Sequence, residues 1–167
     1  MEFRKAVQTD IKPIMNIIEQ AQAYFKAQGI DQWQNHYPNR DTIHQDITNG
    51  NTYILLQNHQ VVATSAISFD EEITYRSIYE GSWITSSDYA VVHRIAVDNH
   101  YKGMGLASKI LRQVELLCLN KKVPSIRIDT HKQNLSMQKL LHKNHFKYCG
   151  IIYLEDGSPR IAFEKVL

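Results

Sequence analysis

Three shortages in this sequence each exclude a class of protein. It has only two cysteines, Cys118 and Cys149, which allow at most one bridge and exclude a disulfide-built secreted scaffold. It has no run of about 18 apolar residues, the length that a membrane-spanning helix requires. Its first residues, MEFRKAVQTD, are charged and lack the apolar centre of a signal peptide. We therefore expect a cytoplasmic protein with no membrane partner.

The net charge is also small. The chain has 19 basic and 17 acidic residues, for a net charge of +2, so it has no general attraction for nucleic acid. An anionic ligand must be held by a local site instead. The 167 residues, of which 43% are hydrophobic, contain no repeat, low-complexity tract or linker. Because this length is close to that of a typical domain, we expect one domain spanning residues 1–167.

The spacing of apolar residues predicts alternating strands and helices. We expect strands at 3–7, 52–56, 61–69, 90–97, 125–129, 146–154 and 161–166, and helices from Thr9 or Asp10 to Gly29, from Asp41 to Gly50, after Gly105 and at 134–143. Residues 30–38 have no clear period, and the shape of 70–88 stays open. This order describes a mixed sheet flanked by helices, with a parallel crossover between residues 90 and 130.

The stretch DNHYKGMGLAS, residues 98–108, places two glycines where a helix begins. Glycine lets an anion approach the unpaired amides at a helix N-terminus, and Lys102 adds a positive charge, so the stretch is typical of a phosphate site. A plain turn would use the same residues. A dinucleotide-binding turn fits poorly, because Ser108 occupies the place of the third glycine and five residues separate Val97 from Gly103.

These residues resemble a known family. The segment KGMGLA, residues 102–107, is similar to the R/Q-x-x-G-x-G/A acyl-coenzyme A motif of the GNAT N-acetyltransferases, with lysine in the first place. A register that begins at His100 is the alternative. About thirty residues later, NLSMQKLLHKNHF, residues 134–146, resembles the family motif N-x-x-A/M-x-x-L-Y-x-K-x-G-F. Two motifs in the right order identify the chain as a member far better than either alone.

The resemblance implies a fold and a cosubstrate. The fold is α/β (α+β), a GNAT-like mixed, mostly antiparallel sheet with a central splayed parallel strand pair flanked by helices. The cosubstrate is acetyl-CoA, and no metal is expected. Its pantetheine arm would pair with the backbone of Ile95, Ala96 and Val97. Its pyrophosphate would lie on Lys102, Gly103, Met104, Gly105, Leu106 and Ala107. Asn134 would hydrogen-bond the cofactor, although it can also simply cap its helix.

The catalytic residues are harder to assign. His93 is our candidate base, because histidine titrates near neutral pH and His93 shares strand parity with Ile95 and Val97; Asp129 and His131 are alternatives. Leu141 stands where the family commonly has a tyrosine acid. Tyr148, Tyr153 or water would then protonate the departing thiolate, and simple packing is the competing reading for both tyrosines.

We therefore expect an N-acetyltransferase that moves acetyl to a primary amine by direct attack in a ternary complex. Trp33 and Tyr37 would line the acceptor side, or belong to a plain surface loop. The acceptor is a small-molecule or peptide amine, and the oligomeric state stays open, with a homodimer as one option. The alternative function is a non-catalytic acyl-CoA-binding sensor, which the missing tyrosine favours. Cys149 has no partner histidine and is expected to be a buried thiol.

Overall fold

The computed structural model describes residues 1–167, which group into two compact units. Unit 1 consists of Met1–Ile67 and Arg94–Ile110, and unit 2 of Ser68–His93 and Leu111–Leu167. Strand β4 (Ala90–Val97) and helix α3 (Leu106–Lys121) contribute residues to both. None of the helices combines the length and the apolar character needed to cross a membrane.

Seven strands form the sheet. They are β1 (Glu2–Lys5), β2 (Thr52–Gln57), β3 (Gln60–Ser68), β4, β5 (Ser125–Thr130), β6 (Lys147–Tyr153) and β7 (Pro159–Val166). Unit 1 has the order β1-β2-β3-β4, and unit 2 has the order β4-β5-β7-β6. The pairs β1–β2, β2–β3, β5–β7 and β6–β7 are antiparallel, whereas β4 and β5 are parallel. The predicted fold class and the parallel pair are therefore confirmed.

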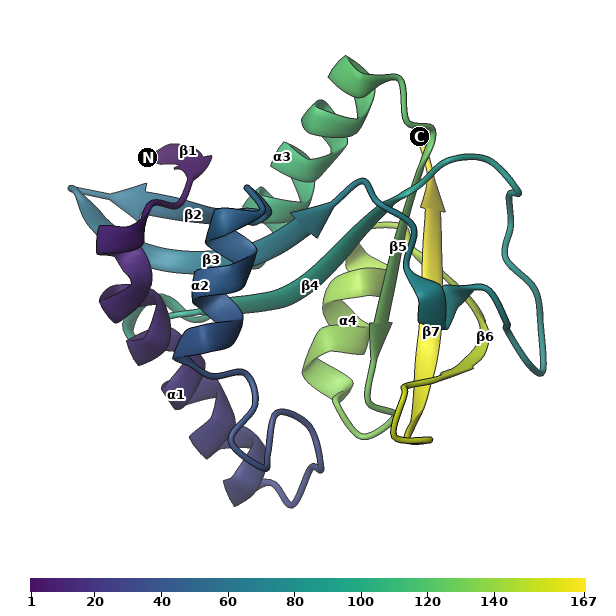
Figure 1. Cartoon of the computed structure of the whole chain (residues 1–167), viewed down its shortest axis with the longest axis horizontal. Helices are drawn as coiled ribbons and strands as arrows, with labels where there is room; N and C mark the ends of the chain where they lie inside the picture. Colours follow the sequence, from purple (N-terminus) through teal and green to yellow (C-terminus); the bar gives the residue numbers. More distant parts are fainter. The chain divides into compact units, whose positions relative to one another are not determined.

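Unit 1 is built around an amphipathic helix. Helix α1 (Ile11–Ala27) and helix α2 (Arg40–Thr48) lie on the same face of the β2–β3 hairpin (Figure 1). The apolar stripe of α1 is buried, and Ile14 and Ile18 have no exposed surface. They share a core with Ile54 and Ala96, so α1 packs directly on the strand that carries the predicted cofactor residues.

The start of α2 corrects one prediction. Asn39, not Asp41, is the N-cap: its Oδ1 accepts a hydrogen bond of 3.0 Å from the backbone N–H of Thr42. Asp41 lies in the first turn instead, where its charge is favourable beside the positive helix end. Both residue types cap helices well, and the reciprocal bond from the Asn39 N–H to Thr42 Oγ1 selects Asn39.

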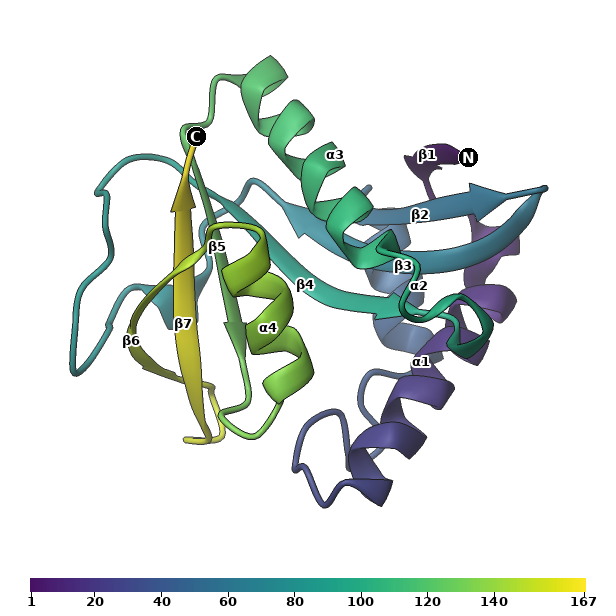
Figure 2. The same ribbon diagram turned by 180° about the vertical axis from the view of Figure 1, so that it is seen from behind.

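Unit 2 contains the three strands β5, β7 and β6, and the start of β4 adds a fourth strand beside β5. Both faces of this sheet are covered. Helix α4 (Leu135–Lys143) covers one face and the segment 70–89 the other (Figure 2). Long-range contacts hold that segment, which the sequence left without a shape. The Arg127 guanidinium lies 4.2 Å from the ring centroid of Trp83 and 4.0 Å from that of Tyr89, and it pairs with the fully buried Glu164. Glu164 also accepts a hydrogen bond from Thr85.

Candidate functional site

The glycine loop before α3 has the backbone that an anion site requires. Gly103 and Gly105 have φ values of +81° and +76°, in the left-handed region that favours glycine. A Cβ added at either position would meet no atom within 4 Å. Packing therefore does not demand these glycines, and the space beside them is open to a ligand.

The amides of this loop are available to that ligand. Helix α3 begins at Leu106, and the carbonyl of Gly105 accepts the first helical bond, 3.1 Å from the Lys109 nitrogen. The amides of Gly103, Gly105, Leu106 and Ala107 donate no backbone hydrogen bond within the chain. A diphosphate fits such a set of donors at a positive helix end.

Helix α1 holds the turn that leads into the glycine loop. Gln20 donates from Nε2 to Asp98 Oδ2 over 3.1 Å, and its Oε1 accepts from the Asn99 N–H over 2.7 Å. One helical turn later, the ring of Tyr24 lies 4.9 Å from Lys102 Nζ. The positive charge predicted beside the phosphate is therefore kept close to the loop by a cation–π contact.

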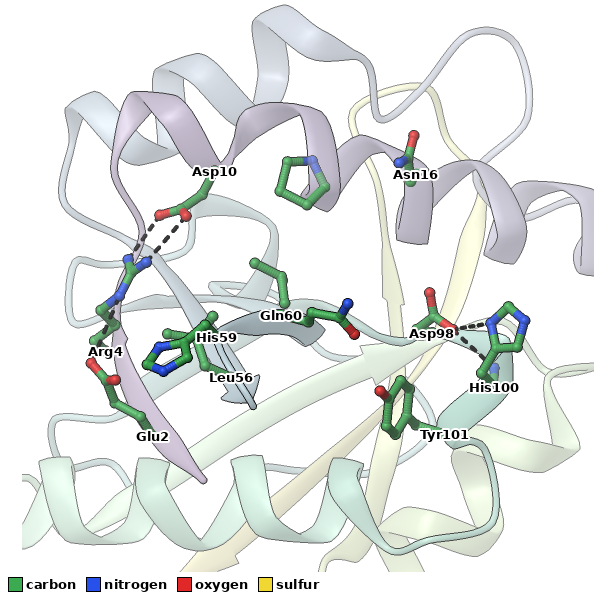
Figure 3. A pocket seen from close by; sticks show the side chains of 12 residues that line it. Glu2, Arg4, Asp10, Asn16, Leu56, His59, Gln60, Asp98, His100 and Tyr101 are labelled. Carbon is green, nitrogen blue, oxygen red and sulfur yellow. Dashed lines mark hydrogen bonds and ion pairs between the residues drawn. The ribbon is translucent and has the colours of Figure 1, made fainter.

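A pocket of about 820 Å³ adjoins the same turn in unit 1. Figure 3 shows the Arg4–Asp10 ion pair on one side of this pocket and Asp98 with His100 on the other, with Tyr101 nearby. Burial opposes ionisation of Asp98, but hydrogen bonds from His100 and Gln20 outweigh it and lower its pKa. Since Asp10 pairs with Arg4 and Asp98 accepts hydrogen bonds from Gln20 and His100, these side chains form a polar wall beside the loop.

Strand β4 departs from regular geometry where the site begins. Its parallel pairing with β5 covers two residue pairs, Ala90 with Ile126 and Val91 with Arg127. Arg94 then has φ +54°, a conformation that costs a non-glycine residue about 1–3 kcal/mol and persists only when surrounding contacts impose it. This left-handed residue interrupts the regular alternation that was assumed between His93 and the pair Ile95 and Val97, so shared parity no longer supports His93 as the base.

His93 lies in a polar cluster of unit 2. Its Nε2 is 3.1 Å from Glu72 Oε2 and its Nδ1 is 3.9 Å from Asp129 Oδ1, and about 30% of its side chain is exposed. Tyr75 donates from its hydroxyl to Asp129 over 2.5 Å. The cluster brings together His93 and Asp129, one of the two alternative bases predicted from the sequence. It also contains Glu72 and Tyr75, which were not predicted.

Two members of this cluster have shifted pKa values. The hydrogen bond with His93 is the main cause that lowers the pKa of Glu72 to about 2, and Thr74 adds two further bonds. Burial, followed by the charge of Asp129, raises the pKa of Tyr75 well above 10. Glu72 is consequently a permanent anion near neutral pH, and Tyr75 is a hydrogen-bond donor that does not give up its proton.

The Glu72 pKa predicts an effect on acid stability. A carboxylate whose folded-state pKa lies below its unfolded value stabilises the fold above about pH 4.5 and loses this contribution as the pH falls toward 2. We expect Glu72→Gln to lower the free energy of unfolding by about 1–2 kcal/mol at pH 7, less than the full linkage value because the side chain is partly solvated. Urea unfolding at several pH values measures the difference, which should shrink between pH 4.5 and 2. A constant difference across that window would contradict the prediction.

The other candidate proton donors and bases are packed or bonded locally. Leu141 is fully buried. Tyr148 and Tyr153 are half-exposed and rest edge-on against Phe163 and Tyr79, with centroid separations of 5.9 and 5.4 Å. His131 Nδ1 accepts a hydrogen bond from the Gln133 N–H in the turn after β5. Tyr148 and Tyr153 therefore have the packing contacts of their competing reading, and His131 bonds within its own turn.

Asn134 occupies the N-cap of α4. Its Oδ1 accepts a hydrogen bond of 3.1 Å from the Met137 N–H, and only 6% of the residue is exposed. The capping interpretation is confirmed, and a contact with the cofactor stays a prediction.

The two predicted acceptor residues lie in the loop between α1 and α2. Trp33 packs edge-on against Phe25, with ring centroids 5.5 Å apart, and contributes to the core of unit 1. Tyr37 is 45% exposed, and its hydroxyl accepts a hydrogen bond of 2.8 Å from Arg94. The structure therefore attaches Tyr37 to β4 and gives Trp33 a packing role.

Both cysteines are buried free thiols. Burial raises the pKa of Cys118 to about 12 and also raises that of Cys149. Thiols in this state are poor nucleophiles at neutral pH, as the sequence analysis predicted for Cys149.

Comparison with known proteins places this chain in a family. The model of the acetyltransferase (GNAT) family matches residues 15–146. An acetyltransferase of the GNAT family from Streptococcus agalactiae 2603 is 36% identical, with a TM-score of 0.90 over 99% of this chain and 95% of its own. The chain therefore belongs to the GNAT acetyltransferase family.

More distant structures share the fold. The PaiA N-acetyltransferase of Thermoplasma acidophilum, solved with coenzyme A, is 14% identical with a TM-score of 0.74, covering 99% of this chain and 98% of its own. The ribosomal-protein-S18-alanine N-acetyltransferase of Escherichia coli is 15% identical with a TM-score of 0.67, covering 99% of this chain and 92% of its own. No curated protein is similar enough to this chain to match it.

Proposed function

We propose that this acetyltransferase transfers acetyl from acetyl-CoA to a primary amine, by direct attack of the amine within a ternary complex. The observation that carries the proposal is the glycine loop, whose left-handed glycines face open space at the start of α3. The coenzyme A complex of the Thermoplasma relative supports the choice of ligand. As expected from the length of the chain, the proposal takes residues 1–167 as one catalytic domain.

The cosubstrate would be held mainly by backbone. The available amides of the loop, those of Gly103, Gly105, Leu106 and Ala107, bind its pyrophosphate, with Lys102 as the nearby cation. The N–H of Met104 already donates to the carbonyl of Tyr101. The peptide groups of Ile95, Ala96 and Val97 pair with the pantetheine amides, because a pantetheine arm hydrogen-bonds as an added strand does. Asn134 offers a further polar contact from the start of α4. Because backbone groups make most of these contacts, few side chains of β4 and the glycine loop have to bind the cosubstrate.

His93 acts as the base in this proposal. A carboxylate can only accept, so the hydrogen bond with Glu72 places the imidazole proton on Nε2 and leaves the lone pair of Nδ1 to take a proton from the ammonium group. The free amine then attacks the thioester carbonyl carbon, a C–N bond forms, and the C–S bond breaks. The attacking nitrogen releases its second proton to water as the amide forms. Asp129, 3.9 Å from Nδ1, stabilises the imidazolium that results.

The departing thiolate needs a proton that Leu141 cannot supply. A thiol with a pKa near 8.5 is a tolerable leaving group, so water suffices, and the hydroxyl of the half-exposed Tyr148 is the side-chain candidate. The acceptor is a small-molecule or peptide amine. Two structures with the same fold are named as ribosomal-protein alanine N-acetyltransferases, which illustrates the peptide option.

The competing function is a sensor that binds acyl-CoA without catalysis, favoured by the buried leucine at position 141. Incubation with acetyl-CoA and a panel of amines, including peptide amino termini, lysine, polyamines and aminoglycosides, separates the two functions. We expect release of free thiol with at least one amine, and mass spectrometry should find that amine heavier by one acetyl group. Tight coenzyme A binding with no thiol release from any amine would support the sensor.

A further inference from the structure

One charged group in unit 1 has no part in the reaction proposed above. Arg94 lies in β4 directly before Ile95, and it contacts both the loop between α1 and α2 and helix α2 itself. Its Nη2 is 2.6 Å from Asp46 Oδ2 on α2, and its Nη1 donates to the hydroxyl of Tyr37 over 2.8 Å. We refer to Tyr37, Asp46 and Arg94 as the Arg94 clamp.

The clamp is largely shielded from solvent. The side chains of Arg94 and Asp46 are 15% and 16% exposed. Arg94 Nε and Asp46 Oδ2 are buried without a well-aligned hydrogen bond, so the 2.6 Å contact between the two groups is mainly an attraction of charges. An ion pair in this position orients its partners strongly, because loss of either one would leave the other charge buried and unpaired.

The loop that carries Tyr37 needs such an anchor. Trp33, Asn35 and His36 all have φ values between +55° and +60°, which side chains other than glycine adopt only when surrounding contacts hold them. Most of its other contacts tie it to neighbouring α1: Gln22 donates to the carbonyl of Pro38, and Gln34 donates to that of Gln22. The bond from Arg94 to Tyr37 is a side-chain hydrogen bond that joins the loop to β4.

We propose that Arg94 is a positioning residue that sets the acceptor loop, residues 28–39, against the strand that presents the acyl group. The guanidinium suits this role because its planar fork contacts two groups at once, whereas an ammonium on a lysine does not bridge them in the same geometry. The left-handed backbone of Arg94 directs the side chain out of the regular strand alternation. This inference rests on the proposed acetyl transfer, and it assigns control of acceptor affinity to residues that do not touch the thioester.

Two mild variants test the clamp without leaving a buried charge unpaired. Tyr37→Phe removes one hydroxyl, and Arg94→Lys keeps the positive charge beside Asp46. We expect each to raise the KM of the amine about tenfold, the value of a hydrogen bond to a charged group, with kcat and the KM of acetyl-CoA changed less than twofold. The double variant should be no worse than Arg94→Lys alone, since both changes remove the same bond. Arg112→Ala, at an exposed arginine on α3, is the control.

Hydrogen exchange of the free protein provides a readout that needs no substrate. Amides of residues 33–37 should exchange several-fold faster in Tyr37→Phe and Arg94→Lys than in the wild type or Arg112→Ala. Unchanged exchange in both variants would overturn the clamp even if no acceptor amine were ever found. Faster exchange with an unchanged amine KM would reduce it to a structural contact and overturn the positioning role. Failure of the wild type to acetylate any amine would instead count against the proposed function.

Discussion

Gly105→Glu is expected to abolish coenzyme A binding, with an affinity at least about 100-fold below that of the wild type. The added carboxylate would occupy the open space beside Gly105 and repel the pyrophosphate from the amides at the start of α3. A side chain at φ +76° also strains the turn, so the substitution disturbs both the backbone conformation and the anion site that depends on it. Isothermal titration calorimetry with coenzyme A measures the loss.

Two variants separate the charge from the backbone strain. Gly157→Glu is the matched control, because Gly157 also has a left-handed φ, +82°, and open space around an added Cβ, but lies in the turn between β6 and β7. It should lose similar stability and keep normal affinity. Gly105→Gln has the shape of the glutamate without its charge, and it should bind better than Gly105→Glu. Normal affinity in Gly105→Glu, or no heat with saturating coenzyme A in the wild type, would refute the phosphate loop and the catalytic proposal with it.

His93→Ala should lower kcat about 100-fold near pH 7, within the range for loss of a general base. The deficit should be largest at low pH and shrink as the pH rises toward 10, because an alkylamine with a pKa near 10.4 then loses its proton without help. Turnover with a fixed amine, measured from pH 6 to pH 10, tests both the size and the sign of this dependence.

Comparison variants show whether the effect belongs to the cluster around His93. Glu72→Gln keeps a hydrogen-bond partner for Nε2 but removes the charge, so we expect a smaller loss, about tenfold, with the same pH trend. His44→Ala, at an exposed histidine on α2, should have no effect. A His93→Ala enzyme whose pH profile overlays that of the wild type would remove His93 from the mechanism and direct attention to Asp129.

The elements near the cofactor loop could be predicted well, because neighbouring residues determine them. Strand β4 has the predicted bounds, 90–97, and α3 begins directly after Gly105. Asn134 is the N-cap of α4, one of its two predicted roles. Each of these features depends on a short stretch of apolar periodicity, a capping side chain or a glycine, and such signals are readable within about ten residues.

The candidate base could be named from the sequence, but its environment could not. Glu72 and Tyr75 lie in a segment without periodicity, which Arg127 and Glu164 hold from β5 and β7. The bond between Tyr75 and Asp129 joins residues 54 positions apart. No local pattern indicates pairs at such separations. The strand alternation used to place His93 is interrupted at Arg94, whose left-handed backbone only its surroundings can impose.

By itself, then, the sequence determined the fold class and the family, and it located the glycine loop that we propose for the diphosphate, since short-range spacing and backbone freedom encode these features. Only the tertiary structure decided which carboxylates face His93 and that Tyr37 is tied to Arg94. The physical reason is that these partners come from distant segments. Their positions depend on how whole elements pack, and packing is a property of the folded chain that no single stretch of residues carries.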